Sequence, residues 1–171
     1  MTSFTVGSLV GGMTTTTLVW LVSGVTQPLP VTLAVTIVGV VSLVGALHDF
    51  RVFRLPLPQA TRQVPRTIFQ NPVLAASFRF GFELGSGLFT YVTTTLPYLV
   101  LVALLLLTPG YETALGVGAA FGLGRALTPV SRWFSGQGTS WDRRMDERTP
   151  LLAPLSLSAA IVGVGLMALF A

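Results

Sequence analysis

Long uncharged apolar stretches constrain the fold of this chain more than any other feature of its sequence. The first runs from about residue 4 to residue 24, and a helix of that length crosses about 30 Å of hydrocarbon. The chain is 51% hydrophobic and only 9% charged, which is more apolar surface than a soluble domain of 171 residues can bury. The sequence therefore predicts an all-α integral membrane protein.

The apolar stretches and the turns between them predict five transmembrane helices. We expect crossings at about 4–24, 31–47, 84–107, 113–130 and 151–171. The segment 73–83 ahead of the third crossing carries charged residues, so it is expected to lie at the interface or to be partly inserted. The N-terminus lacks a basic region, so we expect the first helix to be retained rather than removed as a signal peptide.

Arginine placement predicts the orientation in the membrane. A basic loop at 51–72 and a charged loop at 131–150 fall on the same side of a five-helix protein, and the positive-inside rule makes that side cytoplasmic. The prediction is a multi-pass protein of the cell membrane with its N-terminus inside and its C-terminus outside. Arginines grouped beside apolar stretches indicate contact with lipid headgroups and no nucleic-acid partner.

Part of the chain occurs twice at a constant offset of 78 residues. The matching residues are Gly7-Ser8, Thr15-Thr16-Thr17-Leu18 and Leu21-Val22 in the first copy and Gly85-Ser86, Thr93-Thr94-Thr95-Leu96 and Leu99-Val100 in the second. This self-similarity predicts an internal two-helix repeat with parallel copies, at about 4–50 and 80–130, within one membrane domain covering residues 1–171.

The threonines of the repeat are the first candidate site. A polar path between the two copies would be lined by Thr15, Thr16, Thr17, Thr93, Thr94, Thr95 and Pro97. The alternative is structural, because a threonine hydroxyl in a membrane helix bonds back to the preceding turn or bridges to a neighbouring helix.

Ionisable residues near the expected cytoplasmic ends of the helices form the second candidate site. A cytoplasmic gate would consist of His48, Asp49, Arg79, Glu83 and Arg125. A charge at that depth needs a partner, and Glu83 is expected to pair with Arg79 or Arg125. The alternative is ordinary anchoring, in which the arginines reach the interface and a carboxylate accompanies them.

Small residues four positions apart predict close helix packing or a dimer. These sets are Gly7 with Gly11, Gly81 with Gly85, Gly118 with Gly122, and Gly116 with Ala120 and Gly124.

Catalysis and cofactor binding find little support in the sequence. The chain has no cysteine and one histidine, so we expect no metal site and no cofactor. No nucleophile lies at a plausible depth beside a base, and we expect no enzyme, although a lipid-handling activity stays open.

The motif Phe80-Gly81-Phe82-Glu83-Leu84-Gly85, followed by a helix with Pro97, resembles the membrane core of the CcdA and DsbD family. Proteins of that family carry electrons across the membrane from thioredoxin, using a cysteine in each of two repeat-related helices. Threonines stand here where the family has cysteines, and five crossings with a parallel repeat replace six with an inverted one. The resemblance therefore implies at most a shared scaffold, without thiol chemistry.

Two functional hypotheses follow. The first is a small transport protein, forming a homo-oligomer, that binds or moves a small solute or ion along the threonine path. The second is a non-transporting accessory or assembly subunit that holds another membrane protein through its glycine faces.

Overall fold

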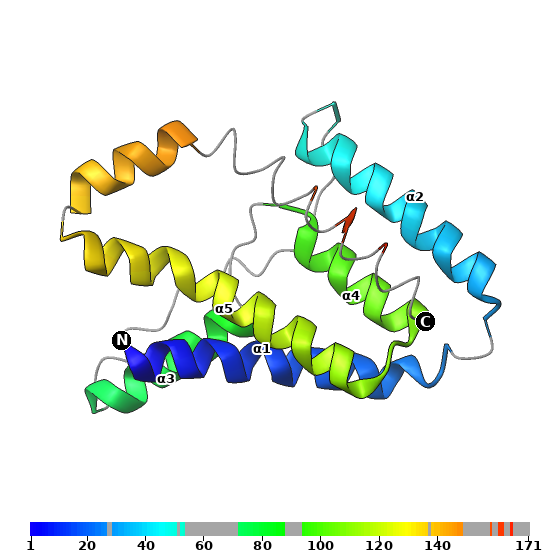
Figure 1. Ribbon diagram of the computed structural model, residues 1–171, viewed down its shortest axis with the longest axis horizontal. Helices are drawn as coiled ribbons and strands as arrows, with labels where there is room; N and C mark the ends of the chain where they lie inside the picture. The colour runs from blue at the N-terminus through cyan, green and yellow to red at the C-terminus, as the bar shows by residue number, and fades with distance from the viewer. Residues whose placement is uncertain are drawn as a thin grey trace.

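The computed structural model describes residues 1–26, 29–50, 52–53, 72–87, 94–136 and 138–148 and the single positions 158, 161, 162 and 165. All regular structure in these residues is helical, which confirms the predicted all-α class (Figure 1). The helices are α1 (Thr2–Ser23), α2 (Val31–Asp49), α3 (Val73–Ser86), α4 (Leu96–Leu107) and α5 (Tyr111–Ser135). Residues 138–148 form a further helix after α5.

Helix α1 packs along α3 on one side and α5 on another (Figure 1), and it also contacts α4. Glycines make both contacts close. A Cβ added at Gly7 would overlap the Phe78 carbonyl of α3, and one added at Gly12 would overlap the Gly118 carbonyl of α5. The predicted small-residue faces of α1 and α3, and the Gly118 and Gly122 face of α5, are thus confirmed as packing faces.

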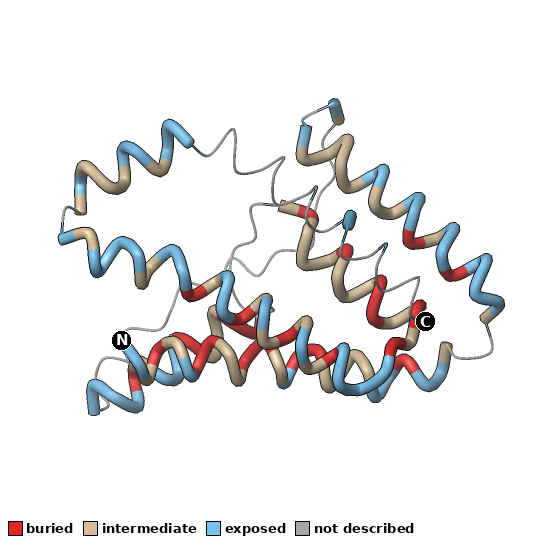
Figure 2. The backbone as a smooth tube through the Cα atoms, viewed as in Figure 1, coloured by how far each residue is buried: buried red, intermediate tan, exposed pale blue. Residues whose placement is uncertain are grey.

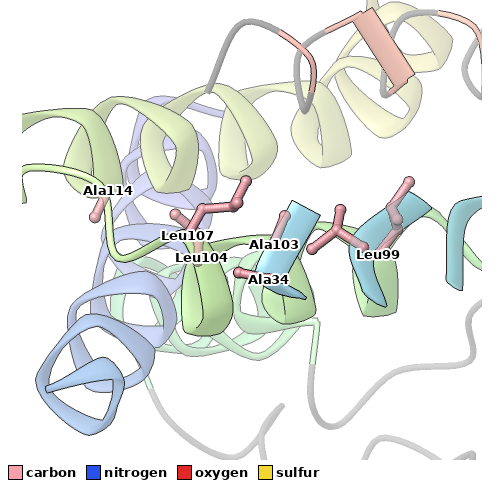
Figure 3. Close-up of a cluster of buried hydrophobic side chains, with 7 residues drawn as sticks. Ala34, Leu99, Ala103, Leu104, Leu107 and Ala114 are labelled. Atoms are coloured by element: carbon pink, nitrogen blue, oxygen red, sulfur yellow. The ribbon is translucent and has the colours of Figure 1, made fainter. Parts of the chain in front are cut away.

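Helices α2 and α4 form a second pair beside α1. Their apolar core meets the start of α5, and Figure 3 shows its side chains. The buried members are Ala34, Val38, Leu99, Ala103, Leu104, Leu107 and Ala114. The opposite side of α2 is exposed along its length (Figure 2), with Val40 at 55% and Leu43 at 62% of full exposure.

Only α1 and α2, among the described residues, are long and apolar enough to cross a membrane. The prediction of five crossings is therefore not supported. Helices α3 and α4 have 14 and 12 residues, fewer than the roughly 20 that a crossing needs. Helix α5 has 25 residues, but its glycines, Glu112, Arg125 and Arg132 make it less apolar. A signal sequence or the core helix of a soluble protein can be as long and apolar as α1 and α2. Most of the surface of α2, however, is not covered by other helices.

The third apolar stretch is broken, so the predicted crossing from 84 to 107 is wrong. Helix α3 ends at Gly87, whose φ of 68° is a left-handed conformation that favours glycine. Helix α4 starts afresh with Pro97 in its first turn, where the missing N–H does no harm. The two repeat copies consequently differ: the first lies in continuous α1, whereas the second is divided between the end of α3 and the start of α4.

The segment 131–150, predicted as a charged loop, is largely helical in the described part. Helix α5 continues to Ser135 and ends at Gly136, which has a φ of 60°. Its charged residues are compatible with helix, and Arg132 and Asp142 pair across the turn between the two helical parts. The basic loop at 51–72 and the final helix at 151–171 lie almost entirely outside the described residues.

Candidate functional site

The hydroxyl groups of α1 are used to join helices. Thr15 donates a hydrogen bond to the Ser86 carbonyl at the end of α3, at 3.0 Å. Ser8 donates to the Gly122 carbonyl of α5, at 2.8 Å. Among the described residues, every buried side-chain nitrogen or oxygen has a hydrogen-bond partner. These contacts match the structural alternative, in which a hydroxyl bridges to a neighbouring helix.

Thr16 bonds back to the preceding turn of its own helix, which is the second structural role expected for a threonine in a membrane helix. Its hydroxyl donates to the Gly12 carbonyl one turn earlier and to the Met13 carbonyl, both at 3.2 Å. Back-bonding of this kind satisfies a threonine inside its own helix.

A small cavity of about 20 Å³ lies where α1, α3, α4 and α5 meet. Its lining residues are Gly12, Thr15, Thr16, Ser86, Gly87, Pro97, Val100, Leu101 and Phe121. The structure thus brings together Thr15, Thr16 and Pro97 from the predicted path. A cavity of this size holds about one water molecule. Thr17 and Thr94 are half-buried outside its lining, and Thr93 lies outside the described residues.

Thr95 lies elsewhere, against Asp49 of the predicted gate. The Asp49 carboxylate accepts hydrogen bonds from the Thr95 backbone N–H, at 3.1 Å to each oxygen, and from the Thr95 hydroxyl at 2.9 Å. This caps the N-terminus of α4 with a negative charge from the end of α2. Gly45 permits the approach, since a Cβ there would lie 2.7 Å from the Thr95 hydroxyl oxygen.

The other gate residues gather on α3 and α5. Arg79 and Glu83 are one turn apart on α3 and form the expected ion pair, with Nε 3.2 Å from Oε1. Their side chains are 59% and 22% exposed, so the pair contributes at most about 1 kcal/mol. Arg125 donates a hydrogen bond from Nε to the Leu84 carbonyl in the last turn of α3, at 3.3 Å. His48, by contrast, is on α2, where it is half-buried next to Asp49. The predicted gate is therefore divided between the end of α2 and the contact of α3 with α5.

Sequence reasoning missed two structural contacts at opposite ends of α5. At its start, the Trp20 indole donates to the Pro109 carbonyl at 3.0 Å, and its ring lies 4.9 Å from that of Tyr111. At its end, Arg132 donates two hydrogen bonds to Asp142, at 2.7 and 2.8 Å. Arginines and acidic residues alternate after position 131, and this sequence pattern could have predicted the contact between Arg132 and Asp142.

The Arg132 contact depends on pH in a defined direction. Its hydrogen bond, with the attraction of the positive charge, holds the pKa of the Asp142 carboxyl below its usual range. Because the pKa of Asp142 is lower in the folded state than in the unfolded state, the stabilisation from this contact is complete above the pKa of aspartate in the unfolded chain. It is lost as the pH falls through the pKa of Asp142 in the folded protein.

Thr15→Val is expected to lower the free energy of unfolding by about 1–3 kcal/mol, because it leaves the buried Ser86 carbonyl without its partner. Thr14→Val is the matched control, since Thr14 is exposed and bonds only to Val10 of its own helix. Unfolding in detergent, followed by circular dichroism, measures both. Equal losses in the two variants would show that the bridge to α3 contributes nothing.

Within the described part of the chain, no group of three His, Asp or Glu residues lies close enough to hold a metal ion.

These features define a small all-helical protein whose polar groups join helices and whose first two helices are long and apolar enough to cross a membrane. Among known proteins, the chain is similar to several named methylamine utilization protein MauF. It is 31% identical over 140 residues to that of Paracoccus versutus, covering 78% of this chain and 50% of the relative. With that of Methylophilus methylotrophus it is 36% identical over 106 residues, covering 59% and 36%.

The protein of the same name from Paracoccus denitrificans is 34% identical over 99 residues, covering 57% of this chain and 35% of the relative. The chain thus spans between about a third and a half of the length of these relatives. No protein-family model matches the chain, and no solved structure does.

These findings overturn the resemblance to the CcdA and DsbD family. The similar proteins carry a different name, and no family model matches. The structure explains the motif that suggested the resemblance: Gly81 and Gly85 are small because the carbonyls of Phe4 and Ser8 on α1 lie against them.

The transport hypothesis is also overturned, because the similar proteins are named for methylamine utilization and favour the accessory alternative. The geometry gives the physical reason. Thr15 and Thr16 use their hydroxyls in hydrogen bonds to helix carbonyls, and the cavity that they line has room for about one water molecule.

Proposed function

We propose that this chain is a non-transporting accessory subunit that holds another membrane protein of an amine-utilization system. The similarity to methylamine utilization protein MauF is the observation that carries the proposal. The polar side chains of α1 support it, because Ser8 and Thr15 bridge to neighbouring helices and Thr16 bonds within its own helix. In this proposal the chain binds and positions its partner and performs no chemistry itself.

The face that holds the partner is proposed to be the second small-residue face of α5. Gly116 and Gly124 have nothing within 4 Å of an added Cβ, and Ala120 between them is exposed. The other glycine face of the same helix already receives α1. A helix of the partner would approach the open face in the same way, since small residues let helix backbones come close.

The proposed placement in the membrane uses α1 and α2 as a hairpin. The short uncharged turn between them would lie outside, and the N-terminus inside with the arginines that follow α2. Helix α5 runs antiparallel to α1, with Gly118 against Gly12 and Gly122 against Ser8. The arginines at the end of α5 would therefore lie on the same side as the N-terminus.

Growth experiments in the native host test the proposed role. Deleting the coding sequence is expected to stop growth with methylamine as the sole source of energy while growth on a sugar continues. Expression of the intact chain from a plasmid should restore growth. Unchanged growth on methylamine after deletion would contradict the role.

Gly124→Leu is expected to weaken retention of the partner by about tenfold or more, because a bulky side chain removes the close approach. The free chain should stay folded, since the position is open. Gly39→Leu is the matched control, at an equally open glycine on α2. Co-purification from native membranes measures both. Equal retention by the two variants would place the contact elsewhere.

A further inference from the structure

A cavity of about 460 Å³ lies where α1 ends and α5 begins. The last turn of α1 forms one side of it, and the turn between α4 and α5 forms another (Figure 1). Binding pockets have volumes of about 300–1,000 Å³, so this cavity, unlike the one beside Thr15 and Thr16, has room for a ligand group. Its walls include Trp20, Ser23, Gly24, Thr108, Pro109 and Gly110.

Trp20 gives the cavity an aromatic wall that is held in place. Its indole N–H donates to the Pro109 carbonyl at 3.0 Å, and its ring lies 4.9 Å from that of Tyr111, tilted by 53°. Because these contacts fix the ring, little ordering is needed when a ligand binds. An indole carries partial negative charge over its face and attracts cations better than the other aromatic side chains do. The wall therefore favours a cation.

Helix ends add partial negative charge at the cavity. Helix α1 ends there at Ser23, and α4 ends there at Thr108, whose φ of 42° is left-handed. Pro109 follows and has no N–H to donate to the carbonyls of the last turn of α4. The carboxyl end of a helix carries about half a negative charge. Helix α5 begins there with its positive end, but Glu112 in its first turn offsets that charge.

Side-chain charges at this end also favour a cation. Glu112 is the only charged side chain in the described segments 19–26 and 105–118. The chain has no lysine, no arginine before position 51 and none between positions 79 and 125. A group with positive charge and an apolar stem therefore complements the cavity.

The open small-residue face of α5 leads to this cavity. Glu112 is exposed and lies four residues before Gly116, so it continues the line of Gly116, Ala120 and Gly124 along one side of the helix. Gly110, which lines the cavity, is the N-cap of the same helix. A partner helix packed along that face thus reaches the cavity at one end.

We propose that the cavity receives a basic side chain of the partner that α5 holds, an inference that rests on the accessory role proposed above. The ammonium or guanidinium group lies over the Trp20 ring and close to Glu112, and its aliphatic stem fills the apolar part of the cavity. An anchor in a pocket, with a charge pair beside it, fixes the register of a helix on an otherwise uniform glycine face. A free small amine fits less well, because it fills little of the volume and makes no use of the adjoining face.

Tryptophan fluorescence of the purified full chain tests the cavity without the partner. The chain has three tryptophans, so Trp20 is the only reporter after Trp133→Phe and Trp141→Phe. The probes are a short acetylated peptide with one arginine between leucines and the same peptide with citrulline, whose side chain is neutral. We expect the arginine peptide to change Trp20 emission saturably and to bind about tenfold more tightly than the citrulline peptide.

Two glutamate variants locate the charge preference. Glu112→Gln should weaken binding of the arginine peptide about threefold. Glu147→Gln is the matched control, with the same loss of charge in the helix at 138–148 beyond the other end of α5, and it should leave binding unchanged. Equal binding of the two peptides, or equal effects of the two glutamate variants, would overturn the proposal. Methylammonium binding as tightly as the arginine peptide would assign the cavity to a free amine and overturn it as well.

The peptide measurement separates this inference from the accessory role. If the arginine peptide does not bind, but a partner still co-purifies with the intact chain, the cavity inference alone is overturned. If the peptide binds but no partner co-purifies, the accessory role is overturned, and the partner's side chain with it.

Discussion

Gly122→Leu is expected to lower the free energy of unfolding by about 3 kcal/mol or more, the largest effect of any single substitution considered. A Cβ at this position overlaps the Ser8 carbonyl of α1, and backbone cannot move aside as a flexible side chain can. Separating α1 from α5 also breaks the hydrogen bond from Ser8 to Gly122, at 2.8 Å. The buried Ser8 hydroxyl then has to find another partner.

Gly124→Leu is the control for this prediction, because it makes the same change two residues along the same helix, where an added Cβ meets nothing within 4 Å. Unfolding of both proteins in one detergent, followed by circular dichroism, gives the comparison. A difference smaller than about 1 kcal/mol would mean that α1 and α5 do not pack through glycine backbone as described.

Asp49→Ala is expected to cost about 2 kcal/mol, because it removes the acceptor for the Thr95 backbone N–H and hydroxyl. Helix α4 then begins without a cap, and its contact with the end of α2 is lost. The apolar core on α4, which includes Leu104, should loosen with it. Protease sensitivity near the start of α4 and the unfolding free energy measure the effect.

Two comparisons sharpen the Asp49 test. Asp49→Asn keeps one acceptor oxygen and should recover part of the loss. Glu112→Ala removes a carboxylate from the exposed first turn of α5, so it should cost less than about 1 kcal/mol. If Asp49→Ala were no more damaging than Glu112→Ala, the cap between α2 and α4 would have no energetic role.

Local patterns predicted the first two helices and the glycine contacts well. An uncharged stretch between turn residues has one regular structure in lipid, so α1 and α2 lie close to their predicted bounds. Glycines four apart present a smooth helix face wherever they occur. The division between α3 and α4 was missed because apolar residues continue through it. Gly87 and Pro97 mark the break, but neither residue ends a helix in every context.

The candidate sites depended on packing that local patterns do not specify. Asp49 and Thr95 are 46 residues apart and meet only because α2 packs on α4. The threonines of α1 posed a different problem, since a hydroxyl lining a path and a hydroxyl joining two helices have the same sequence pattern. The acceptor atoms distinguish them: Thr15 bonds to Ser86 of α3 and Thr16 to its own helix.

Cross-linking at the open face of α5 tests the central claim most directly. The chain contains no cysteine, so Gly124→Cys introduces a unique site for a photoactivated cross-linker in native membranes. Val40→Cys, on the exposed side of α2, provides the control. We expect Gly124→Cys, but not Val40→Cys, to capture one membrane protein reproducibly, and removal of that protein should also stop growth on methylamine. Capture of lipid alone, or of a second copy of this chain alone, would contradict an accessory subunit that holds a partner.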